Sequence, residues 1–226
     1  MSQNGGTKRR HDALSPSSSI GESQKEEERK ERHYMLRVGD EFDGRRYRVQ
    51  RQLGKGTFGR VVEMLDTQED RTVAVKVVRA VDKYTHEAEI EAEIISKVQR
   101  SLPRSSGFPI ARLLRTFEHR GHYCLVLDPM GPSLYHRLRD IRHTLEASQP
   151  PAHRGRPVQH TGSYFTLGQI ATIGRDCFEA LAHLHKIRLT HTDLKPENIL
   201  LVETLPHKHA TPTRFNVSLV DFGGAT

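Results

Sequence analysis

Residues 47–81 carry the pattern that most constrains the fold. The stretch is YRVQRQLGKGTFGRVVEMLDTQEDRTVAVKVVRAV, in which apolar and polar residues alternate, valine is frequent, and a glycine cluster and DTQEDR interrupt the run. Alternation with a period of two is typical of half-buried strands, and breaks rich in Gly and Asp mark the turns between them. The stretch therefore predicts three consecutive antiparallel strands.

A helix and two more strands are predicted after these three. The segment THEAEIEAEIISKVQR has acidic residues early and basic residues late, as the helix dipole favours. Its apolar residues recur at helical spacing, at Ile90, Ile94, Ile95 and Val98. Two strand-like runs, ARLLRTFEH and HYCLVLD, then flank the turn RGH. Residues 47–128 thus predict a five-stranded antiparallel sheet with one helix.

The second half of the chain has a mainly helical pattern. SLYHRLRDIRHTL at 133–145 is helical, and 166–187 forms a long helix whose broad apolar stripe implies burial on more than one face. Residues 146–163 are rich in Pro, Gly and His and are expected to form an insertion loop. The overall pattern predicts an α+β fold with two lobes.

The N-terminal residues are expected to lie outside this fold. Residues 1–33 combine Ser, Gly, Pro and dense mixed charge with almost no apolar side chains, which predicts a disordered tail, and 34–46 form a lead-in segment. The formal charge of +7 would attract phosphate-rich partners, yet the same balance is common in proteins that bind no nucleic acid. No run of 18 apolar residues occurs, so we expect no membrane partner.

The glycine cluster has the spacing of a phosphate site. LGKGTFGRVV places Gly54, Gly56 and Gly59 in the pattern G-x-G-x-x-G, which fits a dinucleotide site, a phosphate-covering hairpin or a plain β-turn. A dinucleotide site needs the last glycine to open a helix, whereas Gly59 leads into the strand RVVEML. The context favours a hairpin tip.

Charged and polar residues that could carry chemistry follow the glycines along the chain. VAVK places Lys76 between apolar neighbours, where a charge needs a partner, and Glu91 lies beside the apolar stripe of the next helix. HTDLKPENILL then packs Asp193, Lys195 and Asn198 into six residues, and DFG follows at 221–223. A charged loop alone would not require all these features in one order.

These motifs resemble those of the eukaryotic protein kinase family, and the likeness covers residues 47–226. HTDLKPENIL is similar to the LAMMER, or CDC-like, dual-specificity branch, because most kinases have Arg where Thr192 stands. AVDKYTHEA agrees with that branch, and DFGGAT is similar to its Asp-Phe-Gly-Ser-Ala-Thr. The resemblance implies a sheet-rich N-lobe at 47–128, a hinge at 128–132 and a helical C-lobe at 133–226.

The resemblance implies a role for each residue of the catalytic loop. Asp193 would accept or orient the proton of the substrate hydroxyl, and Lys195 would lie near the transferred phosphate. Asn198 and Asp221 would hold Mg²⁺ between the phosphates of ATP. Thr192 cannot pair with a phosphate on the activation loop as an Arg would, which predicts activity without loop phosphorylation in any full-length form.

A nucleotide site is implied by the same likeness. Lys76, positioned by Glu91, would grip the α and β phosphates, and backbone groups of the hinge would bind the edge of the adenine. The residues that we assign to this site are Leu53, Gly54, Lys55, Gly56, Thr57, Phe58, Gly59, Val61, Ala74, Lys76, Glu91, Leu127, Asp128, Met130 and Leu200.

The implied function is transfer of phosphate from ATP to Ser, Thr and, in this branch, Tyr of Arg/Ser-rich splicing factors. The implied locations are the nucleus and, secondarily, the cytoplasm. The basic run KRR at 8–10 is either a nuclear localisation signal or solvated surface. Direct binding to nucleic acid is not expected. Kinase domains continue well past DFG, so we expect an incomplete C-lobe, with an exposed apolar surface on the 166–187 helix that favours instability or association. The alternative is a nucleotide-binding or interaction module without turnover.

Overall fold

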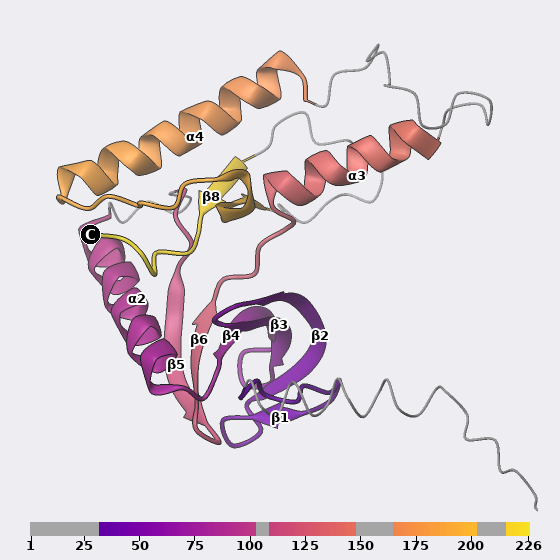
Figure 1. The fold of residues 1–226 in the computed structure, drawn as a ribbon, viewed down its shortest axis with the longest axis vertical. Helices are drawn as coiled ribbons and strands as arrows, with labels where there is room; N and C mark the ends of the chain where they lie inside the picture. Colours follow the sequence, from indigo (N-terminus) through magenta and orange to yellow (C-terminus); the bar gives the residue numbers. More distant parts are fainter. Residues whose placement is uncertain (1–31, 103–108, 148–164, 203–215) are drawn as a thin grey trace, which may run out of the picture.

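The computed structural model describes residues 32–102, 109–147, 165–202 and 216–226 (Figure 1). A curled antiparallel sheet and helix α2 (Asp82–Ser101) form one part of the molecule, and α3 (Leu134–Ala147) and α4 (Leu167–Lys186) belong to the other. This arrangement is the two-lobed α+β fold predicted from the sequence. The tail predicted at 1–33 and the insertion predicted at 146–163 fall almost entirely outside the described residues.

Six strands form the large sheet, in the order β1-β2-β3-β4-β6-β5, and all neighbours are antiparallel. Their bounds are Glu41–Phe42 (β1), Tyr47–Gly56 (β2), Gly59–Asp66 (β3), Arg71–Val78 (β4), Leu113–His119 (β5) and His122–Leu127 (β6). The sequence pattern predicts only five, because β1 has two residues and cannot show an alternation. This extra strand lies in the expected lead-in segment and contributes the fully buried Phe42 to the core.

Helix α2 packs on the sheet through small residues as well as large ones. Its buried residues are Ala88, Glu91, Ala92, Ile95 and Val98. The two alanines pack against Val78 of β4 and Leu125 of β6. The predicted apolar stripe is therefore wrong at Ile90, which is exposed, because the helix turns its alanine face toward these strands.

One apolar core connects the two parts of the molecule. Ile95 and Val98 of α2 pack in the same cluster as Leu184 of α4, Leu219 of β8 and Phe222. Strand β8 (Asn216–Leu219) pairs with β7 (Ile199–Val202) in a separate two-stranded sheet. Each such buried side chain contributes about 1.5–3 kcal/mol, so this shared core stabilises the relative position of the two lobes.

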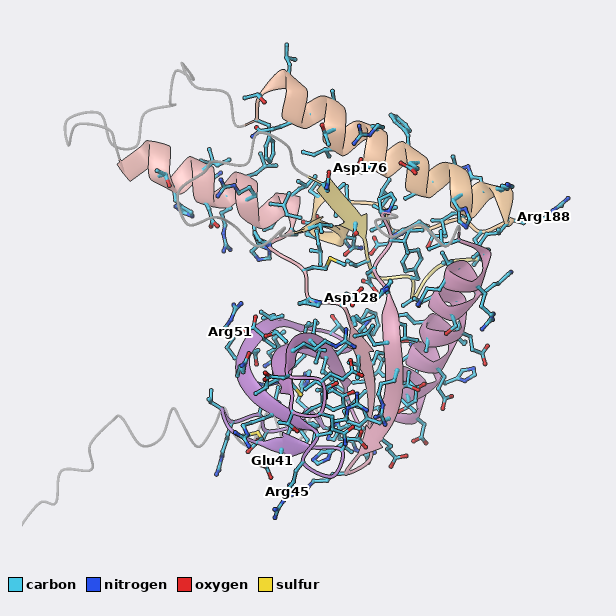
Figure 2. All side chains as sticks on the ribbon, turned by 180° about the vertical axis from the view of Figure 1, so that it is seen from behind. Glu41, Arg45, Arg51, Asp128, Asp176 and Arg188 are labelled. Carbon is cyan, nitrogen blue, oxygen red and sulfur yellow. The ribbon has the colours of Figure 1, made fainter. Side chains whose placement is uncertain are left out.

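Helix α4 is held at its start and along one face. The Thr166 hydroxyl and the Gln169 side chain form a capping box. Asp176, labelled in Figure 2, accepts a hydrogen bond from Val217 N–H of β8 at 3.2 Å. Along the rest of the helix, large apolar side chains are exposed, as we expect from the sequence: Leu167, Ile170 and Phe178. Within the described ranges, no helix is both long enough and apolar enough to cross a membrane.

Candidate active site

Lys76 of β4 and Glu91 of α2 form a buried ion pair. Lys76 Nζ donates to Glu91 Oε2 at 2.7 Å, and the two side chains are 17% and 5% exposed. Burial lowers the pKa of Lys76, but the carboxylates of Glu91 and Asp221 outweigh burial and raise this pKa above its ordinary value. Burial raises the pKa of Glu91, against the opposing charge of Lys76. Lys76 therefore remains a cation inside the protein.

Asp221 brings a second carboxylate to the same lysine. Its Oδ1 lies 3.5 Å from Lys76 Nζ. Its backbone φ of +67° is in the left-handed region, which is uncommon for a residue other than glycine. The next residue, Phe222, is fully buried in the shared core, and its ring centroid lies 5.0 Å from that of His191. His191 Nε2 in turn donates to Val220 O at 3.1 Å, so both neighbours of Asp221 are fixed.

Asp193, Lys195 and Asn198 come together in the loop between α4 and β7. Lys195 Nζ donates to Asp193 Oδ2 at 2.7 Å, and Asn198 Nδ2 donates to Asp193 O and Oδ2 at 2.9 and 3.0 Å. A short 3-10 turn, η2 (Pro196–Asn198), returns the chain so that Asn198 can reach back to Asp193. The hydrogen bond from Lys195 lowers the pKa of Asp193 below its ordinary value. The hydrogen bond thus favours the ionised form of the Asp193 carboxylate, which is the form that can accept a hydrogen bond from a hydroxyl group.

Asn198 and Asp221 have the donor atoms that Mg²⁺ requires. The Asn198 amide nitrogen is engaged with Asp193, which leaves its side-chain oxygen as the atom that can ligate a metal. Mg²⁺ prefers oxygen ligands and is commonly held by one or two protein side chains together with substrate phosphates. Among the described residues, no group of three or more His, Cys, Asp or Glu could hold a metal ion.

The glycine cluster forms the tip of the β2–β3 hairpin. Gly56 pairs with Gly59, so Thr57 and Phe58 make the turn. A Cβ on Gly59 would lie 2.3 Å from Val77 O, so packing against β4 requires a glycine there. A Cβ on Gly54 or Gly56 would meet no described atom within 4 Å. Packing against the described residues therefore does not explain these two glycines.

The hairpin tip is attached to the start of α2. The ring centroid of Phe58 lies 5.6 Å from that of Tyr84, edge to face. Arg79 stacks on Tyr84 at 5.0 Å, its Nη1 donates to Thr57 O at 3.1 Å, and its backbone N–H donates to Phe58 O at 3.0 Å. Neither Arg79 nor Tyr84 is among the site residues assigned from the sequence, although Tyr84 lies within AVDKYTHEA, because apolar spacing does not show that either residue contacts the hairpin. Exposed Leu53 and Lys55 lie on the same hairpin.

The residues assigned to the adenine belong to the large sheet and to β7. In the sheet, Ala74 pairs with Leu127, and Val61 pairs with Lys76. Leu200 of β7 bridges to Ser133, at the start of the second lobe. These side chains come from both lobes, as a site for a flat ring between the lobes requires.

Asp128 and Met130 lie in the segment that we assign to the hinge. Figure 2 shows Asp128 between the sheet and α3. Its N–H donates to Arg112 O at 3.1 Å, and its carboxylate accepts from Arg112 Nε at 2.7 Å. Within the described residues, Asp128 C=O and Met130 N–H make no backbone hydrogen bond outside helices and strands.

Comparison with known proteins agrees with this geometry. The family described as "Protein kinase domain" matches residues 47–226. The serine/threonine-protein kinase AFC1 of Arabidopsis thaliana is 32% identical over 214 residues, which cover 87% of this chain and 41% of that protein. The dual specificity protein kinase CLK1 of Mus musculus is 33% identical over 210 residues, covering 88% of this chain and 39% of the relative.

A further relative is the probable serine/threonine-protein kinase clkA of Dictyostelium discoideum, 34% identical over 86% of this chain and 21% of its own length. The chain spans less than half the length of these curated relatives. A protein kinase domain in general uses ATP and a divalent metal, for which the described site has matching groups. Because the domain match covers most of the chain and the relatives are AFC and CLK kinases, this chain belongs to the protein kinase family.

Proposed function

We propose that the full-length protein transfers the γ-phosphate of ATP to serine, threonine and tyrosine hydroxyls of protein substrates. The observation that carries this proposal is the position of Lys76, 2.7 Å from Glu91 and 3.5 Å from Asp221. The three residues come from β4, α2 and the segment after β8, and only the folded chain brings them together. Phosphoryl transfer depends mainly on positioning and on charge neutralisation, which this cluster provides.

Each part of the site has one task in this proposal. Lys76 binds the α and β phosphates, and Glu91 holds its side chain in place. Asp193 accepts or orients the proton of the substrate hydroxyl, which its 48% exposure permits, and Lys195 neutralises charge near the transferred phosphate. Asn198 and Asp221 would hold Mg²⁺, which supplies charge neutralisation at the phosphates when it is bound.

The nucleotide base would lie between the lobes. Val61 and Ala74 would cover one face of the adenine and Leu200 the other, with Leu127 behind it. The backbone groups of Asp128 and Met130 that lack backbone partners would bind its edge. Leu53 and the hairpin tip would cover the ribose and phosphates, where open space above Gly54 and Gly56 admits a ligand.

The substrate class and location extend the proposal. The likeness of HTDLKPENIL to the LAMMER branch supports Arg/Ser-rich proteins as substrates, and the printed description of mouse CLK1 as a dual specificity kinase supports tyrosine as an additional acceptor. The basic KRR at 8–10 supports residence in the nucleus, with the cytoplasm as a second location. Neither nucleic acid nor membrane is a direct partner in this proposal.

A labelled-phosphate assay tests the proposed function. The full-length protein and residues 1–226 are each incubated with γ-labelled ATP, Mg²⁺ and an Arg/Ser-rich peptide, beside a peptide with alanine in place of every serine. We expect the full-length protein to label the serine peptide. Asp193→Asn should reduce this labelling about 10²- to 10⁴-fold while Mg-ATP binding persists. Binding of Mg-ATP by the full-length protein without any transfer would contradict the proposal and favour the alternative, a nucleotide-binding module without turnover.

A further inference from the structure

The hydroxyl of Thr192 connects the catalytic loop to the segment that follows Asp221. Thr192 Oγ1 donates to Gly224 O at 2.7 Å. The two residues are 32 positions apart in sequence, and neither lies in a helix or a strand. A side-chain hydrogen bond to a backbone carbonyl is therefore a specific link between two loops.

The backbone of Thr192 is strained. Its φ is +65°, in the left-handed region that β-branched residues rarely adopt. Such a conformation persists only where the surroundings determine it, and it is concentrated at functional sites. The bond to Gly224 is the contact of the Thr192 side chain that can hold this conformation.

Backbone hydrogen bonds fix the chain on both sides of this link. Thr190 N–H donates to Thr226 O at 2.7 Å, and Thr226 N–H donates to Thr190 O at 3.1 Å. On the other side, His191 Nε2 donates to Val220 O, directly before Asp221. The Thr192–Gly224 bond thus lies between two anchors, and residues 221–226 are attached to the catalytic loop along their length.

We propose that Thr192 is a positioning residue whose hydroxyl latches residues 223–226 to the catalytic loop and thereby holds the Asp221 carboxylate in its place beside Lys76. The part of this proposal that concerns Asp221 as a metal ligand rests on the proposed function. The latch itself is a statement about the folded chain and is testable without nucleotide.

The hydrogen bond from Thr192 also depends on the absence of a side chain at Gly224. A Cβ on Gly224 would lie 2.8 Å from Thr192 Oγ1, closer than such atoms approach. The Thr192 hydroxyl would have to move, and its bond to Gly224 O would be lost or weakened. The two positions are therefore coupled: removing the hydroxyl matters when residue 224 is glycine and matters little once it is alanine.

The test uses residues 1–226 as wild type, Thr192→Val, Thr192→Ser and Thr190→Val. Valine keeps the branched shape and the backbone preference while removing the hydroxyl, and serine restores the hydroxyl. Thr190→Val is the matched control, since the Thr190 backbone bonds are unaffected and its hydroxyl has no hydrogen bond in the described part of the chain. Amide hydrogen exchange is measured in the peptide that contains 221–226, and nucleotide binding is measured with Mg-ATP and with ATP in EDTA.

Thr192→Val should speed exchange in residues 223–226 about five-fold, the effect of one lost hydrogen bond, while Thr192→Ser and Thr190→Val exchange like wild type. The same variant should weaken Mg-ATP binding about five-fold and leave binding in EDTA unchanged, because only the metal-dependent contact uses Asp221. In a Gly224→Ala background, Thr192→Val should add little to either measurement.

Equal exchange rates of residues 223–226 in wild type and Thr192→Val would overturn the latch. It would also be overturned if Thr192→Ser raised these rates as much as Thr192→Val does. Faster exchange in Thr192→Val with unchanged Mg-ATP binding would retain the latch and reject its link to Asp221. If no form of the chain binds nucleotide, the proposed function of this chain fails, and the exchange measurements still decide the latch.

Discussion

The two ion pairs of the site have the same N···O distance, but one is buried and the other is exposed to solvent. Lys76 and Glu91 meet at 2.7 Å with side chains 17% and 5% exposed, and Lys195 and Asp193 meet at 2.7 Å with side chains 46% and 48% exposed. The first pair joins a strand to a helix across the core of the N-lobe. The second joins neighbours two positions apart in one loop.

The difference shows what each pair contributes. A buried charge without its partner is strongly destabilising, so the N-lobe pair links the position of α2 to the fold itself. An exposed pair contributes little to stability because water and salt screen it. The exposed pair therefore holds the Asp193 carboxylate in one position and favours its ionised form, while nearly half of its surface remains open to solvent.

The largest effect should come from Asp193→Asn, on activity alone. Loss of the base should reduce phosphoryl transfer by the full-length enzyme about 10²- to 10⁴-fold, because asparagine cannot accept the proton. We expect an unchanged melting temperature and unchanged Mg-ATP binding, since the pair is exposed. Steady-state kinetics and a thermal melt check both parts. A clear fall in melting temperature would show that the exposed pair also stabilises the fold, which would contradict the contrast between the two pairs.

Glu91→Ala should do the reverse and affect the fold first. It leaves the Lys76 charge buried and without its main partner, which should lower the free energy of unfolding by about 3 kcal/mol. Mg-ATP binding should weaken in parallel, since Lys76 loses its orientation. Denaturant unfolding and calorimetry measure the two effects. Glu93→Ala, an exposed position on the same helix, is the control and should change neither.

Lys195→Met should raise the pKa of Asp193 and leave the fold unchanged. The hydrogen bond from Lys195 lowers the pKa of Asp193, so the carboxylate becomes protonated at lower pH than it would without Lys195. Removing Lys195 should shift this titration, and the acid limb of activity, to higher pH. An NMR titration of the Asp193 carboxyl carbon checks the direction. A shift to lower pH, or none, would show that Lys195 does not control the protonation of Asp193.

Tyr84→Ala should have the smallest effect of the four. The Phe58 ring would lose its edge-to-face contact with Tyr84, and Arg79 would lose its stacking on the same ring, while the Arg79 hydrogen bonds to Thr57 O and Phe58 O would remain. An aromatic pair contributes about 0.5–1.5 kcal/mol beyond its buried area, so ATP affinity should fall about five-fold. Tyr84→Phe keeps the ring and should bind ATP like wild type. Equal loss in both variants would point to the hydroxyl instead of the ring.

The sequence predicts the strands and the order of the motifs well, because both depend on local patterns. Alternation marks β2 to β6, and helical spacing distinguishes Glu91 from the other acidic residues of its helix. The short β1 and the exposure of Ile90 could not be predicted, since each depends on which face of an element meets the rest of the core.

Contacts between distant loops are the second kind of feature that the sequence does not reveal. The bond from Thr192 to Gly224 and the contact of Phe58 with Tyr84 join residues 32 and 26 positions apart, and no periodicity or motif connects them. The backbone strain at Thr192 and Asp221 is likewise visible only in the folded chain. Such contacts determine how the motif residues are held.

Calorimetric titration of residues 1–226 with Mg-ATP shows whether both lobes together form one nucleotide site. We expect saturable binding at one site per chain, strongly weakened in Asp221→Ala and in Lys76→Met, each of which alters a different lobe. A folded chain that binds no Mg-ATP would show that the two lobes do not form this site. Equally tight binding in wild type and in Asp221→Ala would show that the second lobe contributes nothing to it.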